Sequence, residues 1–313
     1  MIWLLVAAVS LAAADTVERE VTVGAGQWAL PGTLTLPAKG KAPFSAAVLV
    51  HGSGPHDRDE TIAANKPFRD LAHGLASRGI AVLRYEKRTL YYRDKLAAAT
   101  ELTPKEEVLD DAALAVQLLT RTPEIDAKRI FVVGHSMGAT LAPRIARTVV
   151  PVAGIAMLAP SARSVADVLA EQIAYLRTQP ENQVPEAQAK IAEIERSIEK
   201  LRNISPDDSG FVLGAPIPYW RWWSKYDPVG EAKMVDQPIF IAQGERDYQV
   251  TVTDFQMWQQ GIGSRPKVMM KLYPDLNHLF QPGKGRSKPE EYLKPGKMAG
   301  AFLDDLAGWI KGR

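Results

Sequence analysis

Residues 130–147 combine a short apolar strand, a glycine-flanked turn and a helix, and this unit constrains the fold more than any other feature of the chain. The run 130–133 is entirely apolar, which is typical of a strand buried on both faces of a sheet. The sequence Gly-His-Ser-Met-Gly follows at 134–138, and a helical pattern begins within it and extends to residue 147. A buried strand that passes directly into a helix is the building unit of a parallel sheet covered by helices.

The same alternation runs through most of the remaining chain. Residues 16–23 and 28–36 alternate apolar and polar side chains around a turn at 24–26, which predicts an antiparallel hairpin. Further strands are expected at 46–50, 80–85, 152–158, 238–242 and 267–273, and helices at 68–77, 104–120, 253–260 and 298–310. We therefore predict an α/β protein in which a mostly parallel central sheet has helices on both faces.

The alternation is interrupted between residues 161 and 236. An amphipathic helix is expected at 185–202, and a tryptophan-rich segment follows at 218–223. Because an insertion of this length between two core strands is more than a loop, we predict a helical cap over one edge of the sheet. The core then comprises residues 15–160 and 237–313. The alternative is that the inserted helices only extend the core.

The first residues differ from the rest. Residues 2–14 are apolar apart from Ser10, and Ala12 and Ala14 occupy the two small-residue positions of a signal-peptidase site. Such a run rises only about 20 Å as a helix, less than the roughly 30 Å of a bilayer core. We therefore expect a signal peptide at 1–14, export to the periplasm or the medium, and no stable membrane span. No Lys or Arg precedes the run, so the alternative is a terminal strand or helix packed on the domain.

Composition excludes several kinds of chemistry. Lysine and arginine number 38 against 36 acidic residues, a formal charge of +2, and no basic stripe offers a surface for nucleic acid. The chain has no cysteine, which excludes disulfides, thiolate metal ligands and a thiol nucleophile. Covalent catalysis must therefore use an oxygen or nitrogen nucleophile.

Ser136 is the predicted nucleophile, because it is the central residue of the G-x-S-x-G sequence. Between a buried strand and a helix, this sequence forms a sharp turn that raises the serine above the sheet edge. Gly134 and Gly138 leave room where a Cβ would clash. The motif alone is common by chance, and its strand–turn–helix setting gives it weight here.

A serine hydroxyl needs a base to take its proton and a carboxylate to orient that base. Of the five histidines, only His278 lies beyond the serine and outside the motif, in a loop after the last expected strand. Asp247 follows the expected strand 238–242, at the carboxyl end where catalytic groups collect. This chain order, serine then acid then histidine, is the one that such a fold requires. Three other carboxylates compete for the role of the acid: Glu245, Asp254 and Asp227.

The negative charge that develops on a substrate carbonyl requires two N–H donors, which form an oxyanion hole. Met137, directly after the nucleophile, should supply one backbone N–H. The glycine-rich loop after strand 46–50 should supply the other, with Ser53 as the first choice and Gly54 as the alternative. We expect His51 to pack under this loop, hydrogen-bonded to the backbone, rather than to transfer protons.

Two further clusters call for an interpretation. The charged sequence at 56–60 could hold a metal, but no second group at metal-ligand spacing accompanies it, so we expect a loop in which Arg58 pairs with carboxylates. The tryptophans at 220, 222 and 223 could line an acyl pocket or pack the cap onto the core. We therefore expect Trp220, Trp222 and Trp223 to be substrate-binding residues.

Six motifs together resemble bacterial carboxylesterases of the α/β-hydrolase superfamily, a group akin to dienelactone hydrolases and to the catalytic domain of prolyl oligopeptidases. The likeness extends from about residue 46 to residue 281. One departure is Tyr-Glu-Lys-Arg-Thr at 85–89, where relatives usually have Asp and then Gly, and it affects the expected shape of that loop. The motifs are His-Gly-Ser-Gly-Pro-His-Asp-Arg-Asp at 51–59, Tyr-Glu-Lys-Arg at 85–88, Gly-His-Ser-Met-Gly at 134–138, Tyr-Asp-Pro at 226–228, Gly-Glu-Arg-Asp-Tyr-Gln-Val at 244–250 and Asn-His-Leu-Phe-Gln at 277–281.

The resemblance implies an α/β-hydrolase fold with Ser136, Asp247 and His278 as nucleophile, acid and base, in agreement with the assignment made from the residues. We expect a serine esterase for short- to medium-chain acyl or aryl esters, with a small-molecule ester as partner and no cofactor or metal. Many relatives are exported, which agrees with the expected signal peptide. The alternatives are a serine peptidase or acyltransferase with the same triad and, more remotely, a catalytically silent binding protein.

Overall fold

A computed structural model describes residues 15–148 and 151–313 of the chain. The expected signal peptide at 1–14 lies outside the described residues. Among the described helices, none combines the length and the apolar character needed to cross a bilayer.

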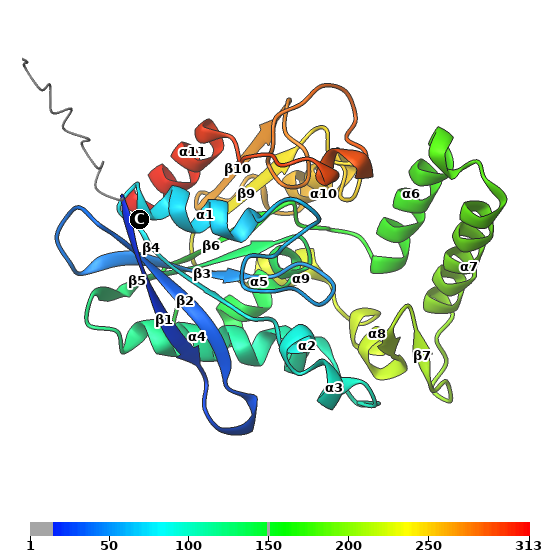
Figure 1. The fold of residues 1–313 in the computed structure, drawn as a ribbon, viewed down its shortest axis with the longest axis horizontal. Helices are drawn as coiled ribbons and strands as arrows, with labels where there is room; N and C mark the ends of the chain where they lie inside the picture. Colours follow the sequence, from blue (N-terminus) through cyan, green and yellow to red (C-terminus); the bar gives the residue numbers. More distant parts are fainter. Residues whose placement is uncertain (1–14, 149–150) are drawn as a thin grey trace, which may run out of the picture.

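The centre of the protein is an eight-stranded sheet with the order β1-β2-β4-β3-β5-β6-β9-β10 (Figure 1). β2 pairs antiparallel with both β1 and β4, and all the other pairs are parallel. This arrangement confirms the predicted mostly parallel sheet entered by an antiparallel hairpin. The strands are β1 (Thr16–Val23), β2 (Leu30–Pro37), β3 (Phe44–Val50), β4 (Ala81–Tyr85), β5 (Ile125–His135), β6 (Gly154–Leu158), β9 (Ile239–Gly244) and β10 (Val268–Tyr273).

Helices cover both faces of the sheet, so neighbouring residues of a central strand belong to different apolar clusters. Val132 packs with α4 (Asp110–Thr120), α5 (Met137–Thr148) and α10 (Val252–Ile262). Val133 packs with the opposite layer, formed by α1 (Pro67–Ala76) and α11 (Gly300–Lys311). Burial on both faces explains why the central strands are continuous apolar runs. Two short helices, α2 (Arg88–Tyr91) and α3 (Arg93–Leu96), follow β4.

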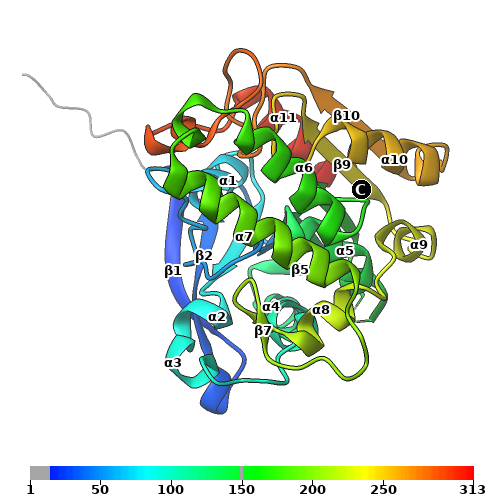
Figure 2. The ribbon, with the colours of Figure 1, turned by 90° about the vertical axis from the view of Figure 1, so that its right-hand side faces the viewer.

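The interruption between β6 and β9 contains two packing units. α6 (Val165–Arg177) and α7 (Pro185–Arg202) pack mainly on each other, around an apolar cluster of their own. They lie at the right of Figure 1 and face the viewer in Figure 2. The hairpin of β7 (Phe211–Val212) and β8 (Ala215–Pro216) leads into α8 (Ile217–Trp223), whereas α9 (Pro228–Lys233) packs against α5 and α10 of the main core. The last part of the interruption therefore belongs to the core layer.

Candidate active site

The turn at Ser136 is a strained connection between β5 and α5. Ser136 has a φ of 53°, in the left-handed region that side chains other than glycine rarely adopt. A Cβ at Gly134 would clash with the backbone of Gly138, and one at Gly138 would clash with the carbonyl oxygen of Val50. The glycines therefore allow α5 to begin directly against the end of β3. This places the first N–H groups of α5, including that of Met137, beside the Ser136 side chain.

His278 and Asp247 form a buried pair. The His278 Nδ1 lies 2.6 Å from Asp247 Oδ2, and the two residues are 3% and 2% exposed. Because a carboxylate oxygen accepts hydrogen bonds, Nδ1 is the donor in this pair, and in the neutral ring the lone pair then lies on Nε2. Asp247 also accepts bonds from the N–H groups of Gln249 and Val250 and from the Gln243 side chain, at 2.7, 3.1 and 3.1 Å. These donors fix the carboxylate in one orientation.

The other candidate carboxylates are occupied elsewhere or exposed. Asp254 is fully buried and pairs with Arg163 at 2.7 Å, at the start of the segment that leads to α6. Asp227 accepts the N–H of Gly230 at 2.9 Å and caps α9. Glu245 is exposed. Asp247 is the carboxylate among the four that the structure brings to His278.

Ser136 and His278 are linked through His135. The Nε2 of His135 lies 3.0 Å from the His278 carbonyl oxygen, and the two imidazole rings have centroids 4.7 Å apart. In the part of the chain that the structure describes, no hydrogen bond joins the Ser136 hydroxyl to His278. Bonds between catalytic groups are often long before substrate binds. The structure thus places the expected nucleophile and base on adjoining segments.

The loop after β3 is held by a buried lysine. Lys87 is 2% exposed, and its Nζ donates to the carbonyl oxygens of Gly52 and Gly54 at 2.7 and 2.8 Å. The same Nζ pairs with Glu107 Oε1 at 2.8 Å. In a trans peptide the C=O and the next N–H point in opposite directions. Because the Gly52 carbonyl faces Lys87, the N–H of Ser53 faces the opposite way.

A second buried charge, Glu60, joins the same loop to the strand of the nucleophile. Glu60 Oε1 accepts the N–H of Gly52 at 2.6 Å. Glu60 Oε2 lies 2.8 Å from His135 Nδ1. The two groups are not aligned as a hydrogen bond requires, so we describe the contact as an ion pair. Burial disfavours charge on both groups, but their attraction outweighs it, lowering the pKa of Glu60 to about 2 and raising that of His135. Gly52 is therefore unavailable as an oxyanion donor.

His51 takes the structural place expected for it. Its Nε2 lies 3.1 Å from the carbonyl oxygen of Asp57, and the residue is buried. Burial lowers the pKa of His51 to about 3, so the ring is neutral at physiological pH. His51 therefore serves as an uncharged packing residue beneath the loop.

The charged sequence at 56–60 is tied down by ion pairs. Arg58 donates to Glu20 at 2.6 Å and to Glu86 at 2.8 Å, which confirms that it links carboxylates. These partners belong to β1 and to the segment after β4, not to the loop itself. Within residues 15–148 and 151–313, no three His, Asp or Glu side chains are grouped so that they could hold a metal ion.

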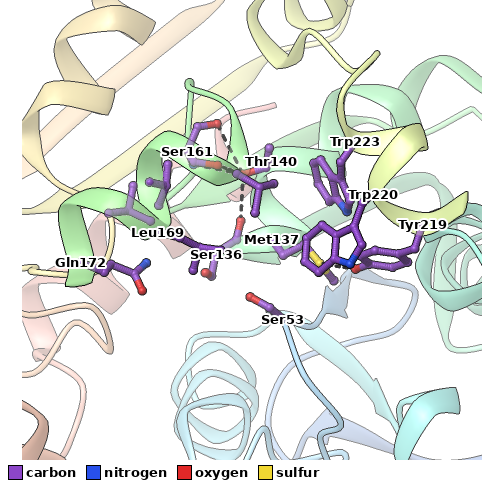
Figure 3. A pocket seen from close by; sticks show the side chains of 13 residues that line it. Ser53, Ser136, Met137, Thr140, Ser161, Leu169, Gln172, Tyr219, Trp220 and Trp223 are labelled. Atoms are coloured by element: carbon purple, nitrogen blue, oxygen red, sulfur yellow. Dashed lines mark hydrogen bonds between the residues drawn. The ribbon is translucent and has the colours of Figure 1, made fainter. Parts of the chain in front are cut away.

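A cavity of about 100 Å³ opens in front of Ser136 (Figure 3). Ser53 and Met137 line it together with residues of α6 and α8, and Figure 3 shows Ser53 facing Ser136 across the space. Trp220 and Trp223 lie in its wall, whereas Trp222 is absent from it and stacks on Tyr226 with centroids 5.0 Å apart. The other lining residues are Thr140, Ser161, Val165, Val168, Leu169, Gln172, Tyr219 and Val250.

A larger cavity of about 400 Å³ lies beyond the same loop. Ser53, Tyr219 and Trp220 line both cavities, so the two spaces adjoin. Most of the wall of the second cavity comes from the segment after β4 and from the β7–β8 hairpin, and the loop after β3, Glu107 and α8 complete it. Tyr219 was not among the predicted site residues. Its hydroxyl donates a hydrogen bond to the Met137 sulfur at 3.3 Å and so connects α8 with the start of α5.

Three residues of the site were missed as functional candidates: Lys87, Glu60 and Tyr219. Lys87 stands inside a motif that carries the resemblance, and Glu60 directly follows another, at the end of the charged sequence 56–60. Their partners lie far away in the sequence, so their roles emerge only from the folded chain. Tyr219 stands next to the tryptophans in the same aromatic segment.

Residues 47–293 match the model of the alpha/beta hydrolase family, and the chain belongs to this family. The chain is 41% identical over 295 residues to Esterase EstD of Thermotoga maritima, an alignment that covers 94% of this chain and 67% of that protein. These matches confirm the resemblance drawn from the motifs.

Solved structures show the same fold. Est1E from Butyrivibrio proteoclasticus matches with a TM-score of 0.59 at 12% identity, covering 94% of this chain and 99% of its own. An acylaminoacyl peptidase of Pyrococcus horikoshii also matches with a TM-score of 0.59, at 15% identity, covering 95% of this chain and 41% of its own. Because esterases and a peptidase share the fold, the fold alone does not select between ester and amide substrates.

Proposed function

We propose that the protein is a serine esterase in which Ser136, His278 and Asp247 form the catalytic triad. The observation that carries this proposal is the buried His278–Asp247 bond of 2.6 Å, on a loop that contacts the strained turn of Ser136. With Nδ1 as the donor in this bond, the neutral His278 ring has its lone pair on Nε2, where it can accept a proton. The identity with Esterase EstD favours ester substrates over amides.

The reaction follows from these positions. His278 Nε2 takes the Ser136 hydroxyl proton while Oγ bonds to the ester carbonyl carbon, and Asp247 stabilises the resulting imidazolium. The imidazolium then gives the proton to the departing alcohol oxygen as the bond from that oxygen to carbon breaks. Water, deprotonated by the same histidine, attacks the acyl-enzyme and releases the carboxylic acid and Ser136. No step requires a cofactor or a metal.

The oxyanion hole is formed by the N–H groups of Ser53 and Met137. Lys87 supports this assignment, because its bond to the Gly52 carbonyl turns the following N–H away from itself. Gly54 is the weaker choice, because it lines the larger cavity but not the one at Ser136. Both proposed donors line the cavity that contains Ser136.

The proposed substrates carry short- to medium-chain acyl or aryl groups. The cavity at Ser136 is smaller than the roughly 150 Å³ space that holds a benzene molecule, so a substrate of this size must extend into the adjoining cavity. The part of segment 161–236 that precedes α9 acts as a cap over both cavities, with Trp220 and Trp223 as substrate contacts. Export to the periplasm or the medium, through the signal peptide at 1–14, completes the proposal.

Labelling with a fluorophosphonate tests the nucleophile. The wild-type protein should gain one adduct on Ser136, located by peptide mass spectrometry, and should hydrolyse p-nitrophenyl butyrate. Ser136→Ala should abolish both, whereas Ser224→Ala, which removes an exposed serine, should preserve both. A folded wild-type protein that remains unlabelled contradicts the proposal. Faster turnover of the matching p-nitroanilide than of the ester would indicate a peptidase instead.

A further inference from the structure

We propose that the 400 Å³ cavity binds the acyl half of the ester, and that the enzyme therefore prefers neutral, apolar acyl groups of medium length joined to a compact alcohol. This inference rests on the proposed function, because it assigns the two halves of an ester to two sides of Ser136. It concerns a site that the triad itself does not specify.

The sheet order sets the direction of the substrate. β5, which carries Ser136, has β6, β9 and β10 on one side and β3 and β4 on the other. Asp247 follows β9 and His278 follows β10, so the acid and the base approach from the first side. Ser53 follows β3, and Thr89 and Leu96 of the large cavity follow β4, on the second side. The large cavity and the base therefore lie on opposite sides of the nucleophile.

The chemistry of the tetrahedral intermediate then assigns the cavities. The departing oxygen must lie near His278 Nε2, because that nitrogen returns the proton to it. The oxyanion lies at the N–H groups of Ser53 and Met137. The remaining substituent, the acyl carbon chain, is directed away from His278. This direction leads past Ser53, Tyr219 and Trp220 into the large cavity, which those three residues share with the nucleophile's space.

The lining of the large cavity selects the kind of acyl group. Its volume lies within the range of small-molecule sites, roughly 300–1,000 Å³. Thr89, the exposed Arg93 and Glu107, whose carboxylate is paired with Lys87, are polar members of the wall, but most of the lining is apolar. The apolar members are Pro55, Leu96, Ala97, Ala99, Leu102, Phe211, Leu213, Ala215, Pro216, Tyr219 and Trp220.

The β7–β8 hairpin supplies a second, independent feature. Phe211 and Leu213 line the cavity, yet they are 50% and 40% exposed. Large apolar side chains left exposed beside a cavity gain burial when an apolar group fills it. The hairpin therefore offers a contact that grows with the length of the acyl chain.

A pair of isomeric esters tests the direction. Methyl octanoate and heptyl acetate have the same atoms, but the long chain is the acyl group in the first and the alcohol in the second. We expect kcat/KM to be about tenfold or more higher for methyl octanoate. Equal values, or a preference for heptyl acetate, would overturn the assignment.

Two neighbouring alanines provide the matched variants. Ala99 lines the large cavity, whereas Ala98 lies outside it on the surface. Ala99→Trp should lower kcat/KM for p-nitrophenyl octanoate about tenfold or more, with p-nitrophenyl acetate unchanged. Ala98→Trp should leave both values unchanged. The cavity does not hold the acyl chain if both variants lose octanoate and acetate activity alike. The same conclusion follows if neither variant changes the ratio of kcat/KM for the octanoate to kcat/KM for the acetate.

The outcomes separate this inference from the proposed function. A protein that is labelled at Ser136 and hydrolyses p-nitrophenyl acetate, yet prefers heptyl acetate, retains the esterase assignment and loses the acyl-site assignment. A folded protein that hydrolyses none of the esters loses both.

Discussion

The burial of Lys87 is the least expected feature of the site, because its side chain is charged. A lysine is rarely buried unless its charge and its donors have partners, and here two carbonyl oxygens and Glu107 provide them. Two carbonyl oxygens of the loop after β3 accept hydrogen bonds from the ammonium group, and Glu107, in the π-helical turn Lys105–Leu109, balances its charge. Under the proposed oxyanion hole, Lys87 is a positioning residue for the Ser53 N–H rather than a group that meets the substrate.

Replacing this lysine should slow catalysis more than it weakens substrate binding. In Lys87→Met the loop loses its anchor, and the Ser53 N–H loses its fixed direction toward the developing oxyanion. We expect kcat to fall about 10- to 100-fold with a small change in KM, measured with p-nitrophenyl butyrate. Lys95→Met, at an exposed position on α3, should retain full activity. A stable Lys87→Met protein with wild-type kcat would contradict this role.

The glycines of the serine turn allow a second comparison at single positions. Gly138→Ala places a Cβ against the Val50 carbonyl oxygen, and we expect a loss of about 1–3 kcal/mol in the free energy of unfolding. Gly308→Ala, in α11 with no atom near the added Cβ, should gain about 0.5–1 kcal/mol. Urea titrations of both variants measure the difference. An unchanged unfolding midpoint for Gly138→Ala would show that the turn has room to relax.

At the residue scale, local chemistry predicts some roles and not others. Ser136 could be proposed because five consecutive residues, 134–138, determine its turn. His278 could be proposed because it is the one histidine beyond the serine and outside the motif. Lys87 could not be assigned, because its acceptors are 33 and 35 residues away and its burial depends on the whole loop. Trp222 carries the same signal as its neighbours, but the fold directs it to Tyr226 instead of the cavity.

At the scale of elements, Glu60 connects the loop after β3 to β5. The carboxylate reaches Gly52 on one side and His135 on the other. Since His135 also contacts the backbone of His278, the pair joins three segments that contribute to the site. Its charge state therefore couples pH to the stability of the region around Ser136.

The Glu60–His135 pair stabilises the fold over a defined range of pH. The pKa of Glu60 is lowered, so its stabilising charge is present above its ordinary value of 4.5 and is lost as pH falls toward about 2. The pKa of His135 is raised, so its contribution is present below 6.5 and is lost as pH rises through the raised value. The pair should thus stabilise the fold most between these two ordinary pKa values.

Glu60→Gln tests this window, because glutamine keeps an acceptor for the Gly52 N–H and removes the charge. We expect it to cost about 3 kcal/mol of unfolding free energy at pH 5.5 and less at pH 9, measured by urea titration. The exposed Glu245→Gln should have no such dependence. A cost that stays constant from pH 5.5 to 9 would refute the ion pair.

Helices and strands with a strong apolar periodicity could be predicted from the sequence, whereas elements whose position depends on tertiary contacts could not. The helix expected at 185–202 has those bounds as α7, and each expected core strand is present, with its ends shifted by a few residues at most except for an earlier start of β5. The expected helix at 104–120 instead begins with a π-helical turn, Lys105–Leu109, which carries Glu107 to Lys87. The short helices after β4 and the β7–β8 hairpin lack a long apolar pattern, and their positions depend on the cavity that they surround.

At the scale of the whole molecule, α6 and α7 form a small separate core. Their cluster includes Ile173, Ile191 and Ile198 and is distinct from the two clusters that sandwich the sheet. A unit with few buried apolar contacts opens at lower free energy than the core does. The pair that covers the serine cavity should therefore open without the sheet unfolding.

Native-state hydrogen exchange measures this difference. Amides of α6 and α7 should exchange through openings of lower free energy than those of β5 and β9. Ile198→Ala should speed exchange in the two helices and leave the strands unchanged, whereas Ile241→Ala, in β9, should speed exchange throughout. Identical opening free energies for α7 and β5 would show a single cooperative unit.

The β7–β8 hairpin has a practical consequence. Since the chain contains no cysteine, a thiol introduced at Leu213 would be the sole attachment point for a fluorescent probe. The Trp220 indole N–H donates to the carbonyl oxygens of Val212 and Ala215, so a dye on the hairpin would sit within quenching range of a native indole. A long-chain alkylboronic acid that binds in the cavity beneath the hairpin should alter the emission of the dye. The fluorescence would then report the occupancy of the cavity in real time.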